Sequence, residues 1–229
     1  GKLRGYQDYR GGGHFSGRLT AALCVAGGIA IQMLERNGVK VKAVLESVCG
    51  QESGIDELIA EAISEGDSLG GTIACTIDGL PCGVGEPMFD GLENRISQAV
   101  FAIPAIKGIE FGDGFKLSEL KGSEARDEYV ASDGKIALTS NHNGGILGGI
   151  STGEAVNFRV CIKPTPSISI PSKSVSYSRG ENVELKISGR HDPCIALRAV
   201  PCIEAAAAIA VLDLMLGDIN FSGRFVFND

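Results

Sequence analysis

Residues 39–78 read VKVKAVLESVCGQESGIDELIAEAISEGDSLGGTIACTID, and this stretch carries the pattern that decides the fold. Residues 39–47 alternate apolar and polar side chains at their start, which is typical of a strand with one buried face. Residues 55–65 place apolar side chains at helical spacing and predict an amphipathic helix. Residues 71–78 predict a second strand, so strand and helix alternate here.

The alternation continues on both sides of this stretch. We expect helices over residues 16–36, 89–103 and 201–216, strands over 105–111, 155–162, 174–178 and 183–187, and a long polar surface loop over 112–143. The last helix is expected to begin with Pro201 and to end just before Gly217. The pattern predicts an α/β (α+β) protein of layered sheets and helices, and no linker interrupts it, so we expect a single domain over residues 1–229.

The composition disfavours several kinds of partner. The chain has 28 acidic and 21 basic residues, a net charge of −7, whereas duplex binding usually needs a basic face. The longest apolar run, residues 202–216, contains two carboxylates and is shorter than the ~20 residues of a membrane span. We therefore expect neither nucleic acid nor a membrane as a partner.

The seven cysteines indicate a reducing compartment. Their number is odd, they form no CxxC pair, and several lie in apolar runs, where a free cysteine behaves as a small hydrophobe. We expect a cytoplasmic protein with no disulfide framework and no metal site. The chain opens with Gly1 rather than Met and shows no secretory signal, and we expect it to be a processed or partial chain.

Glycine is the compositional outlier, with 32 residues that cluster rather than repeat. Residues 10–18 read RGGGHFSGR and precede a helix. Such a turn can bind a phosphate or a carboxylate, because its backbone N–H groups, the helix dipole and the two flanking arginines all attract an anion. The alternative is a tight turn with Ser16 as the helix cap, and a lone glycine-rich loop does not decide between them.

A second glycine-rich segment, residues 140–151, reads SNHNGGILGGIS. It fits either a flat ligand lying against bare backbone or a buried crossing of chain segments where only glycine fits. Residues 163–167 read KPTPS and offer one cation and two hydroxyl groups, or simply an exposed strand end. Each segment alone leaves its alternatives open.

Residues 190–194 read RHDPC and are followed by Arg198. An aspartate between a histidine and a proline, beside arginines, is an arrangement that tunes proton transfer, or else it caps the entry to a helix. Taken together, the cations and glycines suit a small polyanionic ligand beside a flat cofactor. The chain has no P-loop, GxSxG or HExxH motif, and its first glycine-rich loop does not fit a Rossmann site.

These segments resemble the signatures of the chorismate synthase family. The matching stretches are residues 10–21, 83–87, 89–90, 107–115, 140–150, 163–167, 189–194, 198–201 and Glu204, in the family's order. The resemblance implies a β-α-β sandwich and usually a homotetramer. It also implies a lyase of the shikimate pathway, in aromatic amino acid biosynthesis. Such a lyase removes phosphate from 5-enolpyruvylshikimate 3-phosphate by anti-1,4-elimination and needs reduced FMN.

The resemblance also implies roles for individual residues. By position, the flavin contacts are His14, Phe15, Ser16, Pro104, Ala105, Gly148, Lys163, Pro164, Thr165, Pro166, Ser167 and Arg190. Arg18 and Arg190 fall on substrate-binding positions, and Asp192 falls on the acid beside the flavin.

The resemblance covers the C-terminal two-thirds of the family. The family's Gly-Glu-Ser-His-Gly and Arg-Pro-Gly-His-Ala-Asp segments, which contain its catalytic histidines, are not in this chain. His14 and Phe15 stand where the family usually has Arg and Ser. The alternative to the lyase is therefore a catalytically incomplete flavin- or anion-binding fragment with a role in assembly.

Overall fold

The computed structural model describes residues 12–132, 134–187, 189, 191–218 and 221. Its helices are α1 (Thr20–Arg36), α2 (Ile55–Glu65), α3 (Leu92–Phe101), α4 (Gly122–Ala125) and α5 (Ala196–Gly217). Its strands are β1 (Lys40–Val48), β2 (Gly71–Asp78), β3 (Ile106–Phe111), β4 (Tyr129–Ser132), β5 (Lys135–Leu138), β6 (Ile146–Leu147), β7 (Ile150–Ser151), β8 (Val156–Ile162), β9 (Ser172–Ser176) and β10 (Glu181–Leu185).

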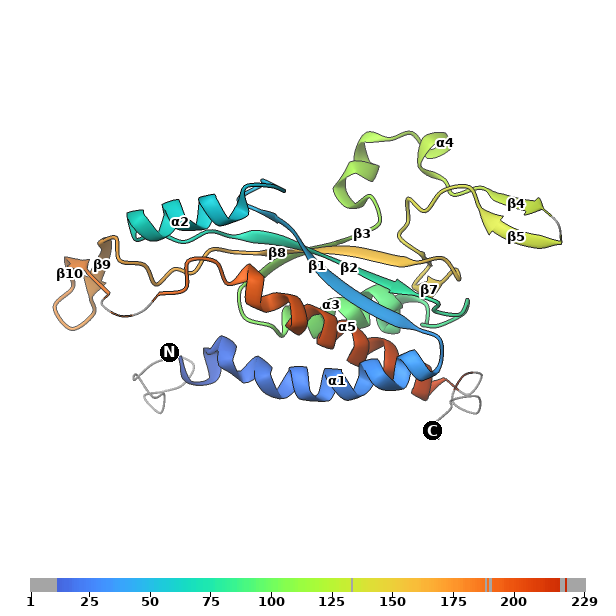
Figure 1. The fold of residues 1–229 in the computed structure, drawn as a ribbon, viewed down its shortest axis with the longest axis horizontal. Coiled ribbons are helices and arrows are strands. Elements are labelled where there is room, and N and C mark those ends of the chain that lie inside the picture. The colour runs from blue at the N-terminus through green and yellow to red at the C-terminus, as the bar shows by residue number, and fades with distance from the viewer. Residues whose placement is uncertain (1–11, 133, 188, 190, 219–220, 222–229) are drawn as a thin grey trace.

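The largest sheet has four antiparallel strands in the order β1-β2-β8-β3 (Figure 1). Along β8, alternate residues such as Val156, Phe158 and Val160 point into the core. The ring of Phe158 packs against Phe111 of β3, with 5.5 Å between the ring centroids. This two-residue period buries one face of the sheet and leaves polar side chains on the other.

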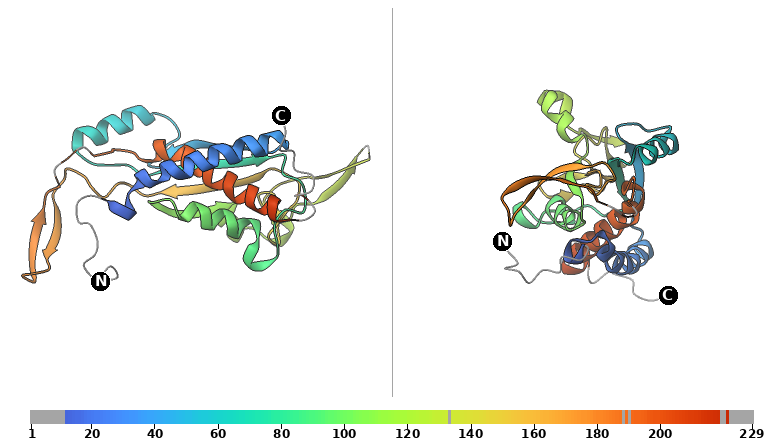
Figure 2. Two further views of the ribbon diagram at one scale, coloured as in Figure 1. Left: turned by 90° about the horizontal axis from the view of Figure 1, so that it is seen from below. Right: turned by 90° about the vertical axis from the view of Figure 1, so that its left-hand side faces the viewer.

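Helices α1, α3 and α5 cover the buried face of this sheet (Figures 1 and 2). Helix α5 lies at the centre of the layer, where it contacts β1, β2, α1 and α3. Its run of small alanines lets α1 approach closely: a Cβ placed on Gly27 would lie 2.2 Å from Cβ of Ala205. Two hairpins, β4–β5 and β9–β10, extend from opposite ends of the molecule (Figure 2).

The predicted mixed α/β (α+β) class is confirmed, and the strands and helices of residues 39–78 form nearly as expected. The last helix differs at its start, because it begins at Ala196 and contains Pro201 in its second turn. Proline there removes the hydrogen bond that the Leu197 carbonyl would accept, and Leu197 is exposed, so water can replace that bond.

Other boundaries also differ from the sequence prediction. The stretch 112–143 is not one irregular loop, because it contains a 3-10 turn at Gly114–Glu119, the short helix α4 and the hairpin β4–β5. The helix expected over 89–103 spans only Leu92–Phe101, since Gly91 before it is extended. Strands β9 and β10 lie two residues earlier than expected.

Two helical segments, Gly17–Arg36 and Ala196–Gly217, are long and apolar enough to cross a bilayer by length and composition. The core helix of a soluble protein passes the same criterion, and α5 packs among the sheet and two other helices. The expectation that the protein has no membrane partner stays a prediction.

Candidate functional site

A cavity of about 920 Å³ opens at the end of the sheet where α1 and α5 begin. Four segments that are distant in the sequence line it: residues 15–20, 103–105, 165–167 and 191–202. A cavity of this size is typical of sites that bind a cofactor or a small ligand. The charged groups among its described lining residues are Arg18, Arg198 and Asp192. Their net positive charge favours an anionic ligand.

The first wall is the turn that leads into α1. Ser16 is extended, and its Oγ accepts a hydrogen bond of 3.2 Å from the backbone N–H of Arg18. The Thr20 hydroxyl donates to the Gly17 carbonyl at 2.6 Å and tightens the same turn. Ser16 therefore begins a 3-10 turn, Gly17–Leu19, and α1 follows it. This local order fixes Arg18 at the rim of the cavity.

The second wall joins Ala105 to the segment after β8. Ala105 has a φ of 75°, a left-handed conformation that is rare for a residue with a Cβ. Its carbonyl accepts a hydrogen bond of 3.0 Å from the backbone N–H of Lys163, which draws residues 163–167 alongside. Such strain is found where surrounding structure holds a functional backbone in place.

Thr165, in this second wall, is held in place by a hydrogen bond to its carbonyl group. Its carbonyl accepts a hydrogen bond of 2.7 Å from the hydroxyl of Ser68, while its own Oγ1 is buried and has no hydrogen-bond partner in the described part of the chain. A buried hydroxyl without a partner is unfavourable, and a bound polar ligand that reorders this segment can satisfy it.

The third wall is the turn before α5. Asp192 Oδ1 accepts a hydrogen bond of 3.2 Å from the backbone N–H of Cys194, and its Oδ2 lies 3.2 Å from Nη1 of Arg198. The backbone N–H of Leu69 donates to the Pro193 carbonyl at 2.7 Å and anchors the turn to the segment just before β2. Burial raises the pKa of the Cys194 thiol, although hydrogen bonds from the first amides of α5 oppose this shift.

The cavity gathers most of the residues that the sequence pointed to. Nine of them line it: Phe15, Ser16, Arg18, Pro104, Ala105, Thr165, Pro166, Ser167 and Asp192. His14, Lys163 and Pro164 are neighbours in the chain but are not part of the lining, and Arg190 lies outside the described residues. Arg198, which follows the RHDPC motif in the sequence, also lines the cavity, as do Ala199 and Cys202, which no chemical motif in the sequence marks as site residues.

Gly148 lies elsewhere, at the turn between β6 and β7. Gly148 and Gly149 have φ values of 62° and 86°, which a two-residue hairpin turn requires. A Cβ on Gly149 would lie 2.5 Å from the Glu86 carbonyl oxygen, and one on Gly144 would lie 2.3 Å from the Gly112 nitrogen. These contacts agree with the close-crossing alternative for residues 140–151. A flavin contact at Gly148 stays a prediction.

Asp127 ties this glycine-rich segment to the rest of the chain. It accepts hydrogen bonds from Ser140 Oγ at 2.7 Å, from Asn143 Nδ2 at 2.8 Å and from the backbone N–H groups of His142 and Asn143. Burial works to raise the pKa of Asp127, but these bonds outweigh it and lower the pKa to about 2. His142 Nδ1 also lies 2.7 Å from Asp113 Oδ2, and this contact is the second one that connects the glycine-rich segment to another part of the chain.

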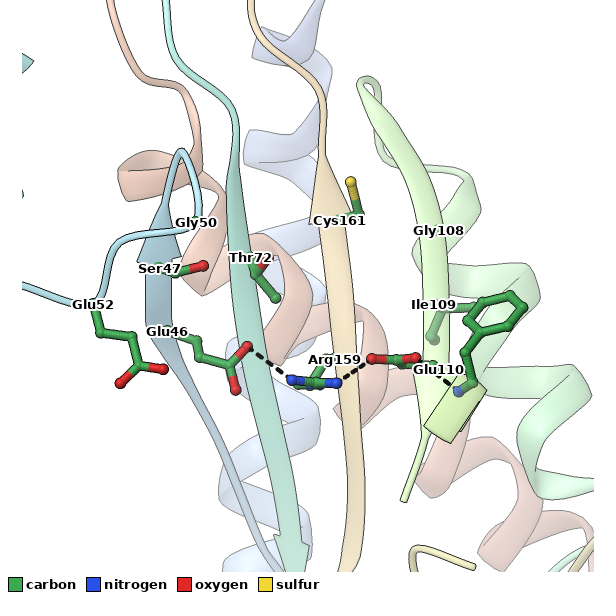
Figure 3. A pocket seen from close by; sticks show the side chains of 11 residues that line it. Glu46, Ser47, Gly50, Glu52, Thr72, Gly108, Ile109, Glu110, Arg159 and Cys161 are labelled. Atoms are coloured by element: carbon green, nitrogen blue, oxygen red, sulfur yellow. Dashed lines mark hydrogen bonds and ion pairs between the residues drawn. The ribbon is translucent and has the colours of Figure 1, made fainter. Parts of the chain in front are cut away.

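A second cavity, of about 420 Å³, lies on the polar face of the sheet (Figure 3). Arg159 lies between two carboxylates there, with Nη1 3.7 Å from Glu46 Oε2 and Nη2 paired with Glu110 (Figure 3). Three glutamates and one arginine are the charged groups among its described lining residues. This charge disfavours a polyanion, so the larger cavity is the candidate site.

The larger cavity can hold a flat cofactor that carries a phosphate. The arginines match anionic groups, the apolar side chains of Ile103, Pro104 and Ala199 offer a surface for a ring system, and the Thr165 hydroxyl lacks a partner. Among the described residues, no group of three His, Cys, Asp or Glu side chains is arranged to hold a metal ion.

The chain is similar to known proteins over most of its length. The sequence profile of chorismate synthase matches residues 1–216. The chorismate synthase of Chitinophaga pinensis is 48% identical over 215 residues, which cover 94% of this chain and 64% of that protein. The chorismate synthase of Korarchaeum cryptofilum is 41% identical, over 93% of this chain and 66% of that protein. The chain thus spans less than two thirds of the length of these two relatives.

The fold agrees with the sequence comparison. A crystal structure of a chorismate synthase superposes with a TM-score of 0.73, at 24% sequence identity, over 88% of this chain and 64% of that one. The order of the matching motifs, the profile match and the identity to these relatives all point the same way. The chain belongs to the chorismate synthase family.

Proposed function

We propose that the gene product containing this chain is a lyase that converts 5-enolpyruvylshikimate 3-phosphate to chorismate with the help of reduced FMN. In this reaction the ring carbon–oxygen bond to phosphate breaks, a proton leaves the ring on the opposite face, and a new double bond forms. The single observation that carries the proposal is the cavity of about 920 Å³, where nine predicted site residues meet. Membership in the family supplies the chemistry.

The walls of the cavity are suited to both ligands. The guanidinium group of Arg18 is a planar donor that matches a carboxylate or a phosphate. The hydroxyls of Ser16 and Ser167 and the backbone around Ala105 offer polar contacts to a flavin. The buried Thr165 hydroxyl is proposed to join them when ligand binding reorders its segment. Lys163 and Arg190 remain proposed flavin contacts, and Arg190 is also proposed for the substrate.

Asp192 is the proposed acid at the reacting centre. Its carboxylate borders the cavity and is held at both oxygens, by the Cys194 N–H and by Arg198. A carboxylate with a fixed orientation can hold a proton at a defined place beside a ligand. Reduced FMN, when bound, supplies electron density to the reacting ring and a place for the departing proton.

The setting of the enzyme is part of the proposal. A biosynthetic enzyme with a small-molecule substrate is expected in the cytoplasm, and the family resemblance implies a homotetramer. Neither nucleic acid nor a membrane is a proposed partner. The free state of all seven cysteines is compatible with a reducing compartment.

One observation favours a second candidate function. The chain spans 64% of the length of its Chitinophaga relative, so groups needed for catalysis can lie outside it. The alternative is a flavin- or anion-binding fragment that serves only in assembly. It predicts binding of FMN without turnover.

An anaerobic assay separates the two functions. The full-length gene product that contains this chain is mixed with FMN, a reductant and 5-enolpyruvylshikimate 3-phosphate, and released phosphate is measured. The lyase predicts release of one phosphate per chorismate formed, and a marked loss of release in Asp192→Asn. Binding of FMN with no release by the full-length protein would exclude the lyase in favour of the fragment.

A further inference from the structure

Two thiols from different helices lie side by side next to the cavity. Sγ of Cys24 on α1 is 3.7 Å from Sγ of Cys202 on α5, and Cys202 lines the cavity. The two residues are 178 positions apart in the sequence, so only the packing of the helices brings them together. We propose that Cys24 and Cys202 form an oxidation site that closes to a disulfide in the presence of a peroxide.

The packing of the helices fixes this pair. One turn further along both helices, Gly27 faces Ala205, and a Cβ on Gly27 would lie 2.2 Å from Cβ of Ala205. The absence of a side chain at Gly27 therefore lets α1 and α5 come closer than a larger residue would allow. Both thiols sit on the facing sides of helices that are already in contact, so little backbone movement is needed to join them.

The local hydrogen bonds hold the two sulfurs next to each other. Sγ of Cys202 lies 3.8 Å from the Arg198 carbonyl oxygen, which accepts a hydrogen bond from this thiol. The Cys24 thiol donates to Cys202 Sγ. A disulfide requires an S–S distance of about 2.05 Å, so the two sulfurs must approach by roughly 1.7 Å.

We expect both thiols to stay reduced unless a strong oxidant is present. Burial, the hydrogen bond to Cys202 and the charge of that neighbour raise the pKa of Cys24 to about 11. Little thiolate is therefore present at neutral pH, and the thiolate is the reactive form. The small fraction of thiolate agrees with the expectation that both thiols stay free in a reducing compartment.

The reaction balances with the peroxide as the oxidant. One thiolate attacks the peroxide, the O–O bond breaks, and a sulfenic acid forms while hydroxide leaves. The second thiol then attacks the sulfenic sulfur, the S–S bond forms and water leaves. In total, two thiols and one hydrogen peroxide give one disulfide and two water molecules, and each sulfur loses one electron.

The test uses the full-length gene product in which the exposed Cys49, Cys82 and Cys161 are replaced by serine, so that bonds between molecules do not interfere. After hydrogen peroxide and alkylation of the remaining thiols, peptides are mapped by mass spectrometry without reduction. We expect the peptides of Cys24 and Cys202 to be linked, with two hydrogens lost and with reversal by a dithiol. Cys24→Ser and Cys202→Ser are the matched controls and abolish the link.

Thermal melting shows whether the disulfide forms without distorting the native structure. A cross-link that closes a long loop without strain raises the melting temperature, here by at least about 5 °C. Alkylation of both thiols after peroxide, their overoxidation without a link, or a link that lowers the melting temperature would each overturn the proposal.

A third measurement connects the pair to the cavity and rests on the proposed function. Because Cys202 lines the cavity, we expect the oxidised protein to bind FMN at least threefold more weakly than the reduced protein. Equal affinities would overturn this connection. Failure of the reduced protein to bind FMN would contradict the proposed function, while the peptide map and the melting temperature still decide the disulfide.

Discussion

Oδ2 of Asp192 lies 3.2 Å from Nη1 of Arg198, which stands in the first turn of α5. A cation at the N-terminal end of a helix interacts unfavourably with the helix dipole, so another interaction must stabilise Arg198 at this position. The ion pair provides one, because it holds the second oxygen of a carboxylate whose first oxygen is held by the Cys194 N–H. Arg198 thus fixes the orientation of the Asp192 carboxylate.

The first prediction concerns this pair. Arg198→Ala should lower kcat for phosphate release by about fivefold, because an exposed ion pair contributes up to ~1 kcal/mol. In an Asp192→Asn background the same change should have little further effect, since Arg198 acts through Asp192. Arg198→Lys should restore part of the loss.

The matched control for this prediction is Arg179→Ala. Arg179 pairs with Glu181 at 3.3 Å on the β9–β10 hairpin and is similarly exposed, and it does not line the cavity. Its loss should leave kcat unchanged. Additive losses in the Arg198 and Asp192 double variant would show that the arginine acts independently of the carboxylate.

The second prediction concerns the contact between α1 and α5. Gly27→Ala places a Cβ 2.2 Å from Cβ of Ala205 and should lower the free energy of unfolding by about 1–3 kcal/mol. Gly28→Ala is the control, because a Cβ there meets nothing within 4 Å. Alanine favours a helix over glycine, so Gly28→Ala should stabilise the protein by up to ~1 kcal/mol. Chemical denaturation measures both, and equal effects would contradict the close packing.

The third prediction concerns pH and Asp127. The pKa of Asp127 is lowered from 3.8 to about 2 in the folded protein, so its ionised form stabilises the fold above the unfolded pKa. Asp127→Asn should therefore lower the free energy of unfolding at pH 7 by about 1–2 kcal/mol after solvent screening. The difference from the wild type should shrink as the pH falls from about 4 to about 2.

Urea denaturation at several pH values checks this, with Glu119→Gln as the control. Glu119 is an exposed carboxylate in the same part of the chain, and its change should have little effect at any pH. A difference between Asp127→Asn and the wild type that stays constant down to pH 2 would mean that the charge of Asp127 is not its cause.

The fourth prediction concerns the left-handed backbone at Ala105. Glycine adopts a φ of 75° without the penalty that a Cβ brings, so Ala105→Gly should raise the free energy of unfolding by up to ~1 kcal/mol. Ala99→Gly within α3 should instead lower it by at least about 1 kcal/mol. Thermal melting compares the two variants, and a loss at both positions would argue against strain at Ala105.

Much of the fold follows from periodicity. The strand at residues 71–78 and the helix at residues 55–65 match β2 and α2 because each has one apolar face and clear ends. Helix α5 begins before the predicted start, because Pro201 lies inside the helix and not at its first position. The Asp133-Gly134 pair, flanked by short apolar stretches, is a hairpin signal that the polar composition of 112–143 obscured.

The candidate site was predictable only in part. The cavity residues could be predicted only from the order of the family motifs. No local sequence pattern indicates that residues 16, 105, 165 and 192 lie close together in space. The Cys24–Cys202 contact and the orphaned Thr165 hydroxyl depend on long-range packing, which sequence spacing does not encode. Asp127 was missed because its partners come from another segment.

We propose that FMN binds in the cavity where α1 and α5 begin. The most direct measurement is a fluorescence titration of FMN with two variants that fill one cavity each: Ala199→Trp in the cavity of about 920 Å³ and Cys161→Trp in the cavity of about 420 Å³ on the other face. We expect at least a tenfold loss of FMN affinity for Ala199→Trp and wild-type affinity for Cys161→Trp. Unchanged binding in Ala199→Trp, or a loss confined to Cys161→Trp, would contradict this proposal.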